Sequence, residues 1–117
     1  MLSLDLDTTI SDLRQRLGSA LLAVDIWDTT SALTLAGFDS RPATGPVLQG
    51  LADDLRTAAA LCGTGLSDHL VLTSAGRSVV VVTAGTLAAA VQLTDDVRPV
   101  QLLSQVVPTL RAVLAAA

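Results

Sequence analysis

Apolar and polar residues alternate along two segments in the first third of the chain. Over residues 21–28 the larger aliphatic side chains occupy every second position, which is the period of a β-strand with one buried face. A second alternation over 33–38 follows the polar turn 28–31, so the two segments predict a hairpin. Gly37, near its end, indicates a bulge or a close approach of another backbone. The inward-facing residues are expected to be Leu22, Val24, Ile26, Leu33 and Leu35.

Apolar spacings of three and four residues predict helices on both sides of this hairpin. The first is short, with Thr8 and Thr9 as candidate caps and Gly18 as its stop. The second runs from about Gly45 to Cys62, carries the strongest helical signal in the chain, and is followed by glycines where it should end. Their apolar faces are Ile10, Leu13 and Leu17 in the first helix, and Leu48, Leu51, Leu55, Ala58, Ala59 and Cys62 in the second.

Three β-rich runs follow, at His69–Thr73, Ser78–Thr83 and Leu87–Leu93. The glycine-containing turns between them are too short for crossover helices, so neighbouring strands must be antiparallel and form a meander. The continuous β-branched run 79–82 is typical of a central strand covered on both faces, so helices should flank it.

A last helix is predicted to begin at Asp95–Pro99, where acidic residues lie near the positive end of the helix dipole and proline lies near the first turn. Pro108 cannot donate a hydrogen bond to the carbonyl of Ser104, so it should kink the helix or divide it in two, and we expect the kink. The apolar stripe of this helix is expected to be Val100, Leu103, Val107, Leu110 and Leu114.

The order of these elements defines a fold class. A chain of 117 residues with half of them hydrophobic suits one globular domain, here 1–117. Helix, strand, strand, helix, three strands and helix (αββαβββα) fit an α+β, profilin-like sandwich. Its five-stranded antiparallel sheet would have the order 2-1-5-4-3, flanked by helices.

Composition removes several classes of function. The net charge is −4, the seven arginines are scattered, and two aromatic residues offer no stacking platform, so nucleic acid is not expected as a partner. The uncharged stretch 78–94 is interrupted by glycine and polar residues, so no membrane insertion is expected. One cysteine and an opening segment without a basic n-region point to a cytoplasmic protein.

Catalytic chemistry has few side chains to use. His69 and Cys62 are the only residues of their types, and Asp68 beside His69 would point to the opposite face of a strand. The loop that begins at Gly63 superficially suggests a phosphate loop, but the chain contains no lysine and therefore no Walker motif. We expect no catalytic residue, no cofactor and no metal site.

With this order of elements, the sequence resembles the roadblock / dynein light-chain family, including bacterial members that regulate Ras-like GTPases. The resemblance spans residues 10–114 and is carried by Leu22–Asp25, by the end of the alanine-rich helix at 58–63, and especially by 69–82. It implies a homodimer without a catalytic centre, in which the middle helices pair and the two sheets often join. It also implies that a GTPase or a motor complex binds the dimer.

Residues of the middle helix are the candidate dimer interface, but two interpretations of them stay open. A helix that packs on a sheet needs an apolar stripe even in a monomer, so the same residues also suit core packing. Ala52 and Ala59, seven residues apart, form a second and shallower apolar face that a second helix could approach closely. The candidate interface residues are Leu48, Leu51, Ala52, Leu55, Ala58, Ala59 and Cys62.

Four further side chains are candidates for contact with a partner. Asp53 and Arg56 lie on the middle helix, where charged residues more often form a solvated face. Trp27 and Phe38 face away from the inward set of the hairpin if the alternation holds. Each ring either anchors a partner or lies beneath a helix, and the pattern does not decide between these.

Two functions remain from the sequence. One is a cytoplasmic, dimeric, non-catalytic scaffold or regulator that binds a small Ras-like GTPase and modulates its nucleotide cycle or location; the GTPase is implied only by the resemblance. The alternative is a profilin-like ligand-sensing domain of the PAS or GAF kind, which the sequence disfavours because it offers few convergent polar groups.

Overall fold

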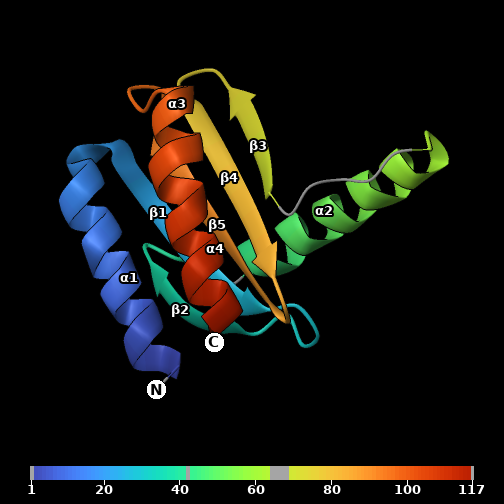
Figure 1. Cartoon of the computed structure of the whole chain (residues 1–117), viewed down its shortest axis with the longest axis horizontal. Helices are drawn as coiled ribbons and strands as arrows, with labels where there is room; N and C mark the ends of the chain where they lie inside the picture. Colours follow the sequence, from blue (N-terminus) through green and yellow to red (C-terminus); the bar gives the residue numbers. More distant parts are fainter. Residues whose placement is uncertain (1, 42, 64–68, 117) are drawn as a thin grey trace.

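The computed structural model describes residues 2–41, 43–63 and 69–116. Its helices and strands follow the predicted order αββαβββα (Figure 1). They are α1 (Leu2–Leu17) with the 3₁₀ turn η1 (Gly18–Ala20), β1 (Leu21–Asp28), β2 (Thr34–Phe38), α2 (Thr44–Leu61), β3 (His69–Ser74), β4 (Arg77–Ala84), β5 (Leu87–Thr94), α3 (Pro99–Gln101), the π-helical turn η2 (Leu102–Val106) and α4 (Val107–Ala116).

The five strands form one antiparallel sheet with the order β2-β1-β5-β4-β3, which confirms the predicted topology. Helices α1 and α4 cover one face of the sheet, and α2 lies on the other (Figure 1). The structure is therefore a three-layer α/β/α arrangement around a single sheet. No helix of the described residues is long and apolar enough to cross a bilayer.

Helix α1 is longer than the sequence predicted. It begins at Leu2, so Thr8 and Thr9 lie inside the helix and do not cap it. The reason is Leu6, which is fully buried one turn before Ile10 and extends the apolar face toward the N-terminus. The predicted stop at Gly18 is confirmed, because this glycine adopts a positive φ of 55° directly after the helix.

The first hairpin packs differently from the prediction. Strand β1 is buried on both faces, because α2 covers the side that carries Asp25 and Trp27. In β2 the inward residues are Ala36 and Phe38, whereas Leu33 and Leu35 are exposed. The register explains this, since Ile26 pairs with Ala36 and the next residue of β1 pairs with Thr34, which leaves Leu35 in a bulge. Gly37 makes a close approach, as predicted: a Cβ there would lie 3.1 Å from the carbonyl oxygen of Val24.

The last helix contains a π-helical turn just ahead of Pro108, the residue at which we expected a kink, and this turn changes the phase of the helix. The π turn η2 immediately precedes α4, so the missing N–H of Pro108 is accommodated by a wider turn. Leu102 and Val106 are consequently buried, while Val100 and Leu103 of the predicted stripe are exposed. From Val107 onward the predicted stripe is confirmed, since Val107, Leu110 and Leu114 are all buried.

Candidate functional site

The side of α2 that faces the sheet is made of small residues. Trp27 projects from β1 toward the helix and is fully buried. Gly45 lies against it so closely that a Cβ there would be 3.3 Å from Cγ of the ring. Ala52, two turns further along, is the other buried residue of the helix. The indole therefore occupies the space between sheet and helix opposite small residues of α2, and Leu48 packs, half-buried, against the same cluster.

Polar side chains fasten the helix to the sheet. The Trp27 indole Nε1 donates to Gln49 Oε1 at 3.0 Å, and Gln49 Nε2 donates in turn to Asp53 Oδ1 at 3.0 Å. Arg56 bridges from the same carboxylate, 3.3 Å away, to the Thr83 hydroxyl of β4 at 2.9 Å. The two charged residues expected to face a partner thus contribute to a network within the chain. Their side chains remain partly accessible, 61% for Asp53 and 39% for Arg56.

Several of the larger apolar side chains of α2 are left outside the core. Leu51 is 39% exposed, Val47 is 66% exposed and Leu61 is 85% exposed. In Figure 1 the second half of α2 extends past the sheet, so no described strand lies under its end. Of the seven candidate interface residues only Ala52 is buried; Leu48, Leu55 and Ala59 are half-buried, and Leu51, Ala58 and Cys62 are exposed.

This arrangement bears on the two interpretations of the helix that the sequence left open. Ala52, part of the shallower face that a second helix could approach, is buried on the sheet side of α2. The leucine stripe (Leu48, Leu51 and Leu55), which also suited core packing, has Leu51 exposed and Leu48 and Leu55 half-buried, and Leu48 packs against the cluster around Trp27. Val47 was missed as a member of the stripe, although its position four residues before Leu51 placed it on the same side.

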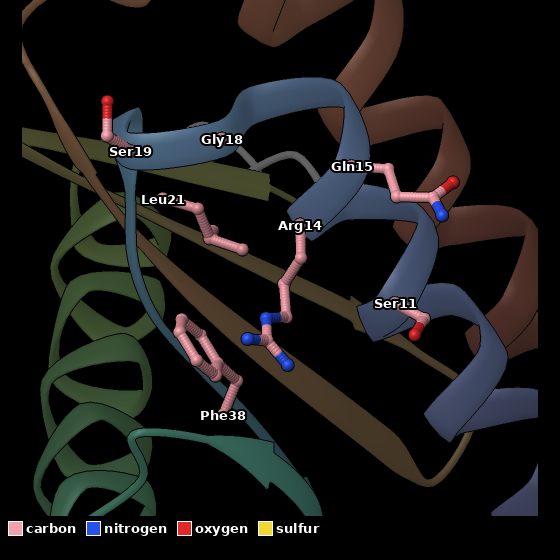
Figure 2. Close-up of a pocket in the computed structure, with 7 residues that line it drawn as sticks. All are labelled: Ser11, Arg14, Gln15, Gly18, Ser19, Leu21 and Phe38. Carbon is pink, nitrogen blue, oxygen red and sulfur yellow. The ribbon is translucent and has the colours of Figure 1, made fainter.

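The two aromatic residues have different surroundings. Trp27 is buried beneath α2, so of the two alternatives left by the sequence it lies under a helix and does not face a partner. Phe38 is half-buried against the α1 layer, and the Arg14 guanidinium stands over its ring, 4.2 Å from the centroid. Figure 2 shows Arg14 reaching from α1 toward this ring across a surface hollow bordered also by Ser11, Gln15, Gly18, Ser19 and Leu21. Arg14 is the one charged residue among those that border the hollow, and the others are neutral. No side chain that could act as a general base borders it beside the two serine hydroxyls.

The one buried carboxylate belongs to Asp25 of β1, among the side chains that the structure describes. Burial raises the pKa of this carboxyl above its ordinary value, while a hydrogen bond donated by the Ser40 hydroxyl opposes the rise. The pair has no histidine to complete a catalytic relay, because His69 lies on β3, with Nδ1 3.3 Å from Arg111 Nη2 of α4. Across residues 2–41, 43–63 and 69–116 no three acidic, histidine or cysteine side chains gather as metal ligands.

The comparisons with known proteins concern structure rather than sequence. No family model and no curated protein matches the chain. Among solved structures, MglB of Myxococcus xanthus has a TM-score of 0.81 at 10% identity, covering 97% of this chain and 87% of that one. The gliding protein MglB of Thermus thermophilus has a TM-score of 0.76 at 16% identity, covering 97% and 88%. A Roadblock/LC7 domain from Streptomyces avermitilis has a TM-score of 0.65 at 20% identity, covering 96% and 92%.

The chain has the roadblock fold. The likeness extends over nearly its whole length, and it agrees with the resemblance drawn from strand and turn patterns in the sequence. A further similar structure, with a TM-score of 0.75 at 11% identity over 96% of this chain and 88% of that one, is described as MglB with a tetrameric arrangement. In this chain the roadblock fold presents two features suited to assembly, the leucine stripe of α2 and the edge strand β3.

Proposed function

We propose that this protein is a non-catalytic regulator that dimerises through α2 and binds a small Ras-like GTPase. The observation that carries the proposal is the exposure of the large apolar residues of α2. Leu51 and Val47 are not needed for the core of their own chain, because Trp27 occupies the space under the helix. Contiguous apolar side chains on a surface helix are typical of an interface with another protein.

A second copy of the chain is the occupant that the geometry favours. The stripe follows the helix in steps of three and four residues, so an identical helix can pack against it in a symmetric contact. Strand β3 is at the edge of the sheet, with β4 on one side and no described strand on the other. Pairing of this edge with its copy would join two sheets, as the family resemblance implies.

The choice of a GTPase as the binding partner rests on the fold and not on a particular site in the chain. Its roadblock fold is shared with the MglB structures, and bacterial members of the family it resembles regulate Ras-like GTPases. A regulator of this kind supplies a surface and no reacting group. That fits a chain in which the described acidic, histidine and cysteine side chains form no catalytic arrangement.

The ligand-sensing alternative has less support from the packing. A sensor of that kind holds its ligand between the sheet and the helices. On the α1/α4 face this space is filled by fully buried side chains, among them Leu13, Val91 and Leu110. On the other face Trp27 occupies it beneath the first half of α2.

Leu51→Asp tests the proposed interface. A carboxylate at this position would have to be buried between two apolar helices, so the variant should be monomeric. Because Leu51 is partly exposed in the single chain, the monomer should keep its circular-dichroism spectrum and its cooperative unfolding. The matched control is Thr57→Asp, which puts the same charge on an exposed position on another side of the same helix and should remain dimeric. A dimeric Leu51→Asp variant would remove the leucine stripe from the interface.

Binding to the GTPase is measured with the same two variants. A Ras-like GTPase of the same organism, loaded with GDP or with a non-hydrolysable GTP analogue, is titrated into each protein by calorimetry. We expect the wild type and Thr57→Asp to bind one nucleotide state preferentially and Leu51→Asp to lose most of the affinity. If all three proteins bind the GTPase equally, binding of the GTPase does not require the dimer. If none of them binds any Ras-like GTPase of the organism, the functional assignment is wrong.

A further inference from the structure

A polar cavity lies on the α2 side of the sheet, at the end of the strands away from Trp27. The register places Trp27 beside Ala88 and Thr83, whereas Ala23, Gln92 and Val79 are paired toward the other end. Arg77 shares the face of Val79, two residues earlier in β4. The cavity measures about 290 Å³ and is bordered there by Arg77 and Gln92.

Described residues just before α2 and at its start also border this cavity. Arg41, Asp39 and Thr44 border it together with the two residues of the sheet. The cavity lining thus includes two arginines, a glutamine and a threonine, which come from β4, β5, the β2–α2 connection and the start of α2. All four can donate hydrogen bonds, and the guanidinium groups are charged at every physiological pH.

These two arginines have no partner among the described residues. Elsewhere in the chain Arg16 pairs with Asp12 at 3.1 Å, and Arg56 pairs with Asp53. Arg41 and Arg77, in contrast, make no side-chain hydrogen bond or ion pair within residues 2–41, 43–63 and 69–116. The Asp39 carboxylate borders the same cavity but forms no ion pair with either of them. The two positive charges exceed the single negative charge of Asp39, and a bound anion would neutralise the positive charge that remains.

We propose that this cavity is a binding site for a phosphate group, held between the guanidinium groups of Arg41 and Arg77. Guanidinium groups match the oxygen atoms of phosphate with paired hydrogen bonds, and Gln92 and Thr44 can donate to the remaining oxygens. The volume is near the lower limit of small-molecule sites, about 300 Å³, so the ligand is inorganic phosphate or a small phosphomonoester. The site does not rest on the proposed dimer or on a GTPase partner.

Inorganic phosphate is the probe for the experiment. It is titrated into ¹⁵N-labelled protein, with sodium chloride at the same ionic strength as the reference, and the side-chain signals of the arginines and of Gln92 are followed by NMR. We expect saturable shifts at Arg41, Arg77 and Gln92. Shifts of equal size with acetate or chloride, or shifts that do not saturate, would overturn the site.

Three substitutions sharpen the test. Arg41→Gln and Arg77→Gln should each weaken phosphate binding about tenfold, because each removes a charge-assisted contact. The matched control Arg98→Gln removes an exposed arginine outside the cavity and should leave binding unchanged. Asp39→Asn should tighten binding, because it removes the negative charge at the cavity while asparagine tolerates the positive φ of 50° found there. If Arg98→Gln lowers the affinity for phosphate as much as the two cavity variants do, the assignment is contradicted. It is also contradicted if Arg41→Gln and Arg77→Gln keep the wild-type affinity and Asp39→Asn does not raise it.

Discussion

The two faces of the sheet use apolar residues in different ways. On the α1/α4 face the large side chains of both helices point inward, and Leu6, Leu13, Leu110 and Leu114 are almost completely buried. On the α2 face the large side chain under the helix comes from the sheet, as Trp27, and the helix contributes Gly45 and Ala52. The first face stabilises the chain by itself. The second fixes the position of α2 and leaves its leucines available to another surface.

The largest effect should come from the α1/α4 face. Leu110→Ala removes a fully buried side chain and should lower the free energy of unfolding by about 2–5 kcal/mol. Chemical denaturation should give the same loss at all protein concentrations. Leu51→Ala is the comparison: its effect should shrink as the protein is diluted, because in the proposed dimer Leu51 contributes through the contact between copies. If both losses are independent of concentration, the distinction between the two faces is wrong.

An intermediate effect is expected at the anchor of α2. Trp27→Phe removes the indole N–H that donates to Gln49 and leaves part of the space beneath the helix empty. We expect a loss of about 1–2 kcal/mol in the free energy of unfolding. Hydrogen exchange should show faster opening of α2 than of α4 in this variant, relative to the wild type. Equal acceleration in both helices would show that Trp27 supports the whole chain rather than α2.

The smallest effect concerns Asp25 and depends on pH. Its pKa in the folded chain is raised above 3.8 by burial, so the folded state holds the proton more tightly than the unfolded state does. The carboxyl therefore contributes stability below pH 3.8, and this contribution is lost as the pH rises through the folded pKa. Asp25→Asn removes the charge and keeps an oxygen that can accept from Ser40. The variant should be more stable than the wild type at neutral pH.

The difference in unfolding free energy between Asp25→Asn and the wild type should disappear in acid. Urea unfolding of both proteins over a pH series measures it. A difference that is constant across the series, or that grows on acidification, would contradict the proposed cost of ionising Asp25.

The sequence was sufficient to predict the elements and their order in the sheet. Alternation along β1 and the short glycine turns of the meander depend on local preferences, which survive in the fold. The rotation of α2 could not be predicted, because it depends on how much space Trp27 takes beneath the helix. Likewise, Pro108 indicated that the last helix is interrupted, but the change of phase depends on the π turn that precedes it.

The candidate site was predicted less completely than the fold. The apolar stripe of α2 that contains Leu51 was identified from its periodicity. That periodicity is expected both of a helix packed on its own sheet and of a helix at an interface, so it could not distinguish the two. Arg41 and Arg77 are 36 positions apart and belong to no motif, so only the folded sheet brings them to one cavity.

The most direct test of the central claim, that α2 presents an interface between two copies, is the solution mass of the wild-type protein. Size-exclusion chromatography with light scattering over a wide dilution range measures it. The account predicts a dimer of twice 11.9 kDa that persists on dilution. A monomer at every concentration would contradict it, because the exposed leucines of α2 would then have no second copy to cover them.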